Sequence, residues 1–296
     1  MNRKYLAALL LGLLGLAVQA QENSPTLQKI AASGTIYLGH NEASVPFSYV
    51  LPGQETPAGY SWDICGKVVQ ALAAKLGKPL TVVPVVATSN TRLMLVKTGM
   101  ANIECGATTN TVARQKQVAF STTFFVSEVK AMVRAGSGIG SLADLANKRV
   151  VTTSGTTADR LIKQAALQRG MVIQHLMGRS HAESMGMMAR GEVDAYVADD
   201  AILAGQRAGA ADPAQLVLLD ESLSVEPYGL VLPAGDLPFK QLVDATLVGL
   251  MKSGEMEALY AKWFAQPIPP SGRSLNLPLS EINKASFQFP SDRPGN

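Results

Sequence analysis

Residues 79–107, PLTVVPVVATSNTRLMLVKTGMANIECGA, contain two strand-like runs that enclose one short amphipathic segment. The first run, at 79–87, is rich in valine, a residue that favours strands. The segment at 91–100 has apolar residues at helical spacing and closes with Gly99. The second run, at 101–107, again favours a strand. Strand, helix and strand in this order predict a unit of two parallel strands joined by a helix.

The same alternation extends to both sides of this unit and forms two series. The first series adds a strand at 35–40 and helices at 63–78 and 111–120. The second series has the following predicted elements: a short helix at 141–148, strands at 149–155, 171–176 and 193–200, and helices at 156–170 and 183–191.

Two extended segments, 128–136 and 226–235, connect the two series, and helical signals at 239–264 return the chain to the first one. This pattern predicts an α/β protein of two lobes, each a mostly parallel sheet flanked by helices, with two hinge crossovers and a cleft. The expected boundaries are 21–131 with 230–296 for lobe 1, and 132–229 for lobe 2. A chain of 296 residues is long enough for two such cores.

The first twenty residues, MNRKYLAALLLGLLGLAVQA, are typical of a secretory signal peptide. Arg3 and Lys4 precede an apolar run that is shorter than the about 20 residues needed to span a bilayer. The small-x-small pattern that ends at Ala20 predicts cleavage before Gln21. We therefore expect an exported, soluble protein of the periplasm.

Charge gives no support for nucleic-acid binding. Removing Arg3 and Lys4 from the 26 basic residues leaves 24, against 23 acidic ones, so the mature chain is nearly neutral. No basic run is interleaved with aromatic residues. No metal site and no cofactor are expected either.

The only two cysteines, Cys65 and Cys105, could form a disulfide in an oxidising compartment. Cys65 falls inside an expected helix and Cys105 inside an expected buried strand. Since buried free cysteine packs as a small hydrophobe, the sequence favours two core thiols.

Polar residues follow the ends of six predicted strands, in GHNEAS, ATSNTR, GATTNT, TTSGTT, RSHAES and ADD. The carboxyl ends of strands in such sheets are where ligands collect. Hydroxyls, two arginines, a histidine and an aspartate at one cleft suit a small zwitterion that carries a further polar group.

Five collinear stretches resemble the family 3 periplasmic solute-binding proteins of ABC importers, and most closely the glutamate/aspartate-binding members. They are VPFSY at 45–49, ECGATTNTVARQKQVAFS at 104–121, VVTTSGTT at 150–157, DDAILAGQRA at 199–208 and KWFAQPIPP at 262–270. The resemblance implies two lobes of the type II periplasmic-binding-protein fold that close on an amino acid. It also implies delivery to an inner-membrane ABC permease, a monomer, and no chemistry on the ligand.

The resemblance assigns the ligand α-carboxylate to Arg114 and Thr109, with the backbone near Ala107 taking part. An arginine fork can bind a carboxylate through two parallel hydrogen bonds. A helix expected to start at 111 would add free N–H groups.

The ligand α-amine is assigned to Asp199, with helix capping as the role of its neighbour Asp200. In the turn of the second lobe, the resemblance assigns ligand contacts to Thr153 and Thr156. Capping and turn formation by these threonines are compatible with such contacts.

Side-chain specificity is assigned to Ser89, Arg92 and His181, and one position departs from the family pattern. The glutamate/aspartate-binding members have GHRE where this chain has GHNE, with Asn41 in place of arginine. Arg92 and a protonated His181, with help from Arg179 or His40, could hold an acidic side chain. Alternatively, the Asn41 amide favours glutamine or asparagine. The sequence favours the acidic ligand, and Arg179 is expected to be solvated.

Three other features have structural interpretations. Met185, Met187 and Met188 are expected to pack in a core. Trp263 and Phe264 are expected to anchor the C-terminal helix, and the polar tail at 286–296 to be loosely attached. An exported dehydratase on the same scaffold is the alternative to a binding protein, but no nucleophile–base pair is visible.

Overall fold

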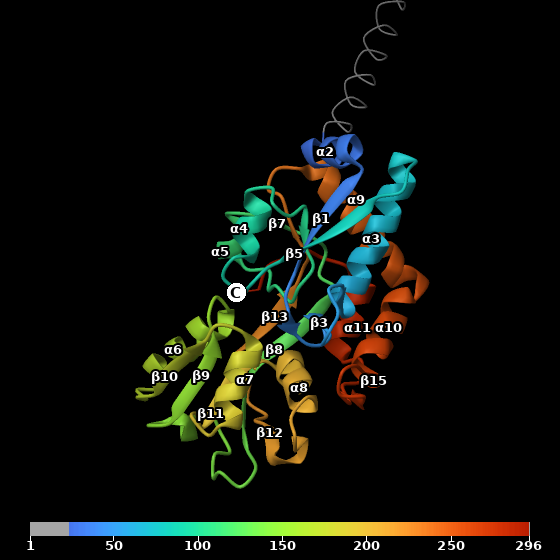
Figure 1. Ribbon diagram of the computed structural model, residues 1–296. Coiled ribbons are helices and arrows are strands. Elements are labelled where there is room, and N and C mark those ends of the chain that lie inside the picture. Colours follow the sequence, from blue (N-terminus) through green and yellow to red (C-terminus); the bar gives the residue numbers. More distant parts are fainter. Residues whose placement is uncertain (1–23, 296) are drawn as a thin grey trace, which may run out of the picture.

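The computed structural model of the protein describes residues 24–295, so the predicted signal peptide lies outside the described residues. The chain forms two lobes, each built on one large mixed sheet with helices against it (Figure 1). The predicted α/β architecture is therefore confirmed. Within this part of the chain, no helix is long and apolar enough to cross a lipid bilayer.

The sheet of lobe 1 has five strands. Their order is β5 (Thr81–Val86), β1 (Thr35–His40), β6 (Ile103–Glu104), β14 (Val231–Leu232) and β7 (Ala119–Phe120). Strand β1 lies between β5 and β6 and is parallel to both, so the two strands of the opening stretch are parallel to each other as predicted, whereas β14 is antiparallel to β6 and β7.

Alternating side chains let helices cover both faces of this sheet. Leu232 belongs to the main core with Val68 and Leu72 of α3 (Tyr60–Leu76). Its neighbour Val231 packs instead with Val96 of α4 (Arg92–Lys97). Helices α2 (Pro25–Ser33), α9 (Leu237–Ser253), α10 (Glu255–Tyr260) and α11 (Glu281–Gln288) also belong to this lobe.

The sheet of lobe 2 has six strands. They are β10 (Gln174–Gly178), β9 (Arg149–Thr153), β11 (Ala195–Asp199), β8 (Phe125–Arg134), β12 (Leu216–Leu218) and, also beside β8, β13 (Ser224–Tyr228). Val150 packs with α6 (Thr157–Gln168), while Val151 faces the core on the other side. Helices α7 (His181–Ala189) and α8 (Asp200–Ala208) contact this sheet as well.

Strands β8 and β13 overlap the two extended segments, 128–136 and 226–235, that the sequence predicts as crossovers, and the second segment continues into β14 of lobe 1. Strands β8 and β13 run antiparallel, with Phe125 opposite Tyr228. Phe47 packs against both of these rings, and Phe264 packs against Phe125 and Phe47. Phe264 is fully buried and Trp263 nearly so, which confirms the predicted anchor of the C-terminal helices.

The free-thiol prediction is wrong, because Cys65 and Cys105 form a disulfide with an S–S distance of 2.04 Å. Cys65 lies on the buried side of α3, and Cys105 directly follows β6. Helix and strand pack together there, so the two sulfur atoms meet in the core of lobe 1.

Several boundaries also differ from the prediction. The helix expected at 111–120 is the single turn α5 (Val112–Gln115), because Val118 and Phe120 turn into the core and the chain enters β7. The short helix expected at 141–148 is one 3₁₀ turn, Ala143–Leu145.

The C-terminal tail is not loosely attached. Residues 286–288 belong to α11, and the Ser291 carbonyl accepts a hydrogen bond of 2.8 Å from the amide of Thr123 in lobe 1. By contrast, the packing role of the methionines is confirmed, since Met188 is fully buried and Met185 and Met187 pack against the same core.

Candidate functional site

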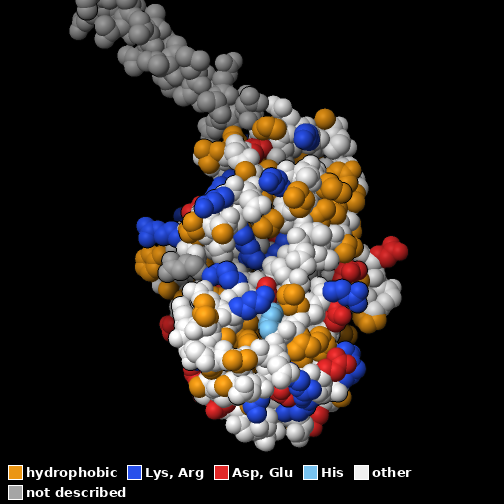
Figure 2. Space-filling model, turned by 90° about the vertical axis from the view of Figure 1, so that its left-hand side faces the viewer, with side chains coloured by type: hydrophobic (Ala, Val, Ile, Leu, Met, Phe, Trp, Pro, Cys, Tyr) orange, Lys and Arg blue, Asp and Glu red, His pale blue; other side chains and the backbone are white. Residues whose placement is uncertain are grey.

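The side chains that the sequence places at strand ends meet between the lobes. Arg92 comes from α4 of lobe 1, whereas His181 and Asp199 come from α7 and β11 of lobe 2. Each of them is at most 5% exposed. Figure 2 shows lysine and arginine side chains gathered at the waist between the lobes, with a histidine beside them. Basic side chains therefore flank the junction of the lobes on this face of the molecule.

Arg114 links the two lobes directly. Its Nη1 donates to the Thr109 carbonyl at 2.8 Å, and its Nη2 donates to the Gly155 carbonyl at 3.3 Å. Burial, followed by the nearby Arg92, lowers the pKa of Arg114 to about 9. The guanidinium group therefore remains charged at neutral pH.

Thr111 sets the direction of the short helix that carries Arg114. Its hydroxyl accepts a hydrogen bond of 3.2 Å from the Arg114 amide and caps α5. Because α5 is one turn long, its N-terminus adds little dipole at this point. The predicted longer helix would have contributed its N-terminal N–H groups to carboxylate binding. With the short helix, binding of a carboxylate would depend mainly on the Arg114 guanidinium group.

The lobes also touch at the turn that follows β9. Asn90 Nδ2 donates to Ser154 Oγ at 3.1 Å. Gly155 has a φ of +79°, and a Cβ atom there would lie 2.5 Å from Asn90 Oδ1. Glycine alone permits both this backbone conformation and the close approach of the two lobes.

His181 is held in a hydrogen-bond network inside lobe 2. Its Nδ1 lies 2.7 Å from the Tyr196 hydroxyl and 3.2 Å from Thr153 Oγ1. Burial, followed by Arg92, lowers the pKa of His181 to about 3. The expectation of a protonated His181 is therefore wrong, and the histidine is neutral at neutral pH.

Arg92 is the second fixed cation of the site. Its Nη1 donates to the Ala107 carbonyl at 3.4 Å. Its buried Nε has no hydrogen-bond partner in residues 24–295. Since buried donors are normally paired, this guanidinium group is suited to a further acceptor.

Asp199 and Asp200 have different surroundings. Asp200 Oδ1 accepts hydrogen bonds from Ser127, from the Glu128 amide and from its own helix at Ala201. Asp199 Oδ1 is buried with no partner in the described part of the chain. Burial, followed by the Glu226 carboxylate, raises the pKa of Asp199 to about 7. A bound ammonium group would pair with the ionised carboxylate of Asp199 and would lower its pKa, which offsets both of these causes.

Two buried glutamates of this cluster were missed in the sequence. Glu104 and Glu226 are 2% and 3% exposed. Glu104 accepts a hydrogen bond of 2.7 Å from Thr108, and Glu226 accepts one of 2.9 Å from Thr157. Each is a carboxylate between two apolar residues of a strand segment, which is the one signal in the sequence that could have identified them.

The remaining predicted residues lie at the edges of the cluster or outside it. Ser89 is buried beside the turn at Gly155, whereas Asn41 is partly exposed and its Oδ1 accepts from the Ala43 amide at 2.9 Å. The Thr156 hydroxyl donates to the Thr153 carbonyl at 2.6 Å. The Arg179 side chain is 91% exposed and pairs with Glu183, so it is solvated as expected.

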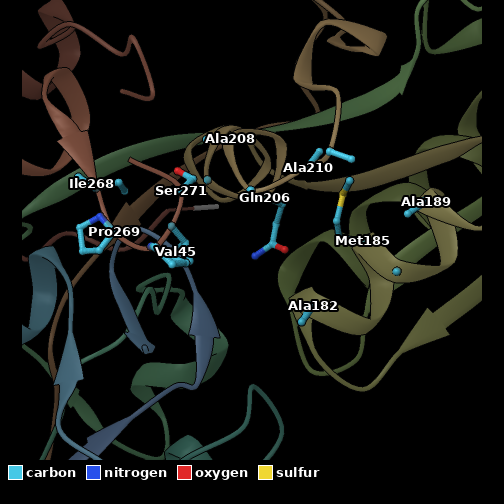
Figure 3. Close-up of a pocket in the computed structure, with 15 residues that line it drawn as sticks. Val45, Ala182, Met185, Ala189, Gln206, Ala208, Ala210, Ile268, Pro269 and Ser271 are labelled. Carbon is cyan, nitrogen blue, oxygen red and sulfur yellow. The ribbon is translucent and has the colours of Figure 1, made fainter. Parts of the chain in front are cut away.

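An apolar groove of about 400 Å³ also lies between the lobes (Figure 3). Its walls come from α7, α8, Val45 and the segment 268–271, and no charged side chain lines it. Without a fixed charge, this groove does not match the ends of a zwitterion. Two arginines and an unpaired carboxylate oxygen, by contrast, suit a ligand with an ammonium group and two anionic groups.

The family model that describes bacterial extracellular solute-binding proteins, family 3, matches residues 36–266. The chain belongs to this family. An L-glutamate/L-aspartate-binding protein of Pseudomonas aeruginosa is 41% identical, over 97% of this chain and 95% of that protein. A glutamate/aspartate import solute-binding protein of Escherichia coli K12 is 40% identical, over 94% and 93%.

Solved structures share the fold. A glutathione-bound periplasmic binding protein from Brucella ovis gives a TM-score of 0.72 at 23% identity, over 79% of this chain and 73% of that one. A mutant arginine-binding protein from T. maritima gives 0.71 at 24% identity, over 81% and 100%. These likenesses show the two-lobed type II fold of periplasmic binding proteins and nothing about the ligand.

Proposed function

We propose that this family 3 solute-binding protein captures L-glutamate or L-aspartate in the periplasm and delivers it to an inner-membrane ABC permease. The observation that carries this proposal is a pair of arginines, buried Arg92 and half-buried Arg114, beside the buried Asp199 between the lobes. Relatives of about 40% identity over nearly the whole chain are named for these two ligands, which supports the same choice.

The proposed roles follow from charge. Arg114, with Thr109 and the backbone at Ala107, holds the α-carboxylate, and Asp199 holds the ammonium group. Arg92 and Ser89 hold the side-chain carboxylate, with Thr153, Thr156 and neutral His181 completing the wall of lobe 2. Asn41 closes the first strand-end loop. Each charged end of the ligand then meets a group of opposite charge.

Capture is proposed to proceed by closure of lobe 2 onto lobe 1. Contacts such as Asn90–Ser154 and Arg114–Gly155 form only when the lobes approach, so ligand binding stabilises the closed arrangement. A permease that distinguishes the closed arrangement would recognise loaded protein. The ligand leaves unchanged.

Isothermal titration calorimetry on protein that was unfolded, washed and refolded tests the proposal with glutamate, aspartate, glutamine and asparagine. We expect tight binding of the two acids. Tight binding of the amides alone would refute an acidic ligand and assign the specificity to Asn41. Consumption of the ligand in the same samples would refute a role limited to binding.

A further inference from the structure

The residues after α11 form a strap that crosses lobe 1 toward the hinge. Figure 1 shows the end of the chain beside α5, between the two lobes. The strap comprises residues 291–295 and lies beyond the segment 36–266 that matches the family model. It contacts Thr123 just before strand β8, and its Asp292 carboxylate pairs with Lys240 of α9 at 2.9 Å.

Asn110 is the residue that the strap holds. Its side chain is fully buried, and its Nδ2 donates to the Asp292 carbonyl at 2.8 Å. Its own carbonyl accepts from the Gly295 amide at 2.9 Å. Two main-chain groups of the strap therefore satisfy two polar groups of Asn110.

The other two polar groups of Asn110 extend the connection. Its amide donates to the Pro227 carbonyl of strand β13 at 2.7 Å. Its Oδ1 accepts from Gln115 Nε2 at 2.9 Å, and the same nitrogen also reaches the Asp292 carbonyl at 3.3 Å. Strap, hinge strand and helix α5 are thus joined at one buried side chain.

Both neighbours of Asn110 lie in the loop that forms the proposed carboxylate site. Thr109 pairs with Tyr228 at the end of β13, and its carbonyl accepts from Arg114. Thr111 pairs with Gly295 of the strap and caps the helix that carries Arg114. A shift of Asn110 would therefore move the groups on which the arginine fork depends.

We propose that residues 291–295 are a positioning strap that fixes the carboxylate-binding loop 109–114 against the hinge and thereby sets ligand affinity. The strap touches no ligand. It acts by holding the loop in its binding geometry before the ligand arrives, which lowers the ordering cost of binding. This proposal rests on the proposed function for its ligand.

Two variants and one matched control test the strap. The first variant ends at Pro290. The second is Gly295→Val, since a Cβ at Gly295 would lie 2.9 Å from Pro227 Cδ and would push the strap off β13 without shortening the chain. The control is Arg293→Ala, which changes an exposed side chain of the strap and keeps its main chain.

Calorimetry should show Kd values for glutamate and aspartate that both rise about tenfold in the two variants, with an unchanged ratio, because the α-carboxylate is common to both. Arg293→Ala should leave both Kd values unchanged. Hydrogen exchange without ligand should quicken at the amides of Asn110, Arg114 and Gln115 while the rest of lobe 1 stays protected. A role in stability alone would lower the melting temperature and leave Kd unchanged.

The possible results separate the two proposals. Folded variants with unchanged Kd values and unchanged exchange at 109–115 overturn the strap. If the variant ending at Pro290 does not fold, Gly295→Val decides. If the unaltered protein binds neither acid, the proposed ligand is wrong, and the exchange measurement alone still supports or overturns the strap.

Discussion

Replacing Arg114 with alanine removes a side chain that donates hydrogen bonds to the backbone of both lobes. In the structure its two terminal nitrogens reach the carbonyls of Thr109 and Gly155 at 2.8 and 3.3 Å. A ligand α-carboxylate would bind the same planar group. The substitution therefore removes the proposed anchor of the ligand and one contact that forms on closure.

The size of the effect follows from the two hydrogen bonds of an arginine fork. Each bond to a charged group contributes about 1.5–3 kcal/mol net, so the pair contributes about 3–6 kcal/mol. Since 1.4 kcal/mol corresponds to a factor of ten, Kd should rise by about two to four orders of magnitude. Arg114→Lys keeps a point charge without the fork, and we expect a smaller loss.

Calorimetry with refolded protein measures this loss, and circular dichroism establishes that each variant is folded. Arg179→Ala is the matched control, because that arginine is 91% exposed and its side chain pairs with Glu183 on the surface of lobe 2. A folded Arg114→Ala protein that binds glutamate within twofold of the unaltered protein would show that the carboxylate site lies elsewhere.

Four further predictions concern stability, pH and specificity. Replacing Cys65 and Cys105 with alanine removes a disulfide that closes a loop of 40 residues, and it should lower the free energy of unfolding in urea by about 4 kcal/mol. A loss below about 1 kcal/mol would contradict this prediction. Because the pKa of Asp199 is raised to about 7, protonation of Asp199 should weaken ligand binding about tenfold for each pH unit below 7. Calorimetry from pH 5.5 to 8 should show that ligand binding releases a proton. A Kd that does not change with pH would exclude Asp199 as the ammonium partner. Asn41→Arg should raise the affinity for glutamate relative to glutamine about ten- to a hundredfold in paired titrations. Glu104→Gln should also shift this ratio toward glutamate, by about tenfold, and an unchanged ratio would show that Glu104 does not compete for the arginines.

The pH prediction has a counterpart in stability. The folded pKa of Asp199 lies above the ordinary aspartate value of 3.8. The folded protein therefore binds more protons than the unfolded chain between about pH 4 and 7. The titration of Asp199 alone therefore makes the free energy of unfolding fall as the pH rises from about 4 to 7. Below about pH 4, Asp199 is protonated in both states and adds no pH dependence.

Local patterns in the sequence were sufficient to predict most of the strands and helices of the two lobes. Strand β1 coincides with its predicted range because its apolar, β-branched residues favour a strand without help from distant segments. The helix predicted after β6 stopped at Gln115, because tertiary burial of Val118 and Phe120 outweighed helical spacing. Tertiary packing overrides helix propensity where burial of core side chains requires a different backbone conformation.

Distant contacts within the site could not be read from spacing. The arginines, Asp199 and His181 were identifiable through a resemblance and through their positions at strand ends. Glu104 and Glu226 were missed because burial of a carboxylate depends on partners elsewhere, here Thr108 and Thr157. The contact of Asn110 with Asp292 spans 182 residues, so no local pattern could show that the tail is attached.

Ligand choice depends on how far the two arginines are already neutralised. Glu104, Asp199 and Glu226 are three buried carboxylates near two guanidinium groups. Burial raises the pKa of Glu104, while Arg92, Thr108 and Arg114 lower it.

An acidic amino acid brings two carboxylates and one ammonium group into this cluster, which adds one negative charge. Its carboxylates compete with Glu104 for Arg92 and Arg114, so binding would raise the pKa of Glu104 further and favour its protonation. An amide ligand has no net charge and makes no such demand. Protonation of Glu104 thus favours glutamate over glutamine, whereas protonation of Asp199 weakens both ligands alike. Lowering the pH should therefore reduce the affinity for both and still increase the preference for the acid.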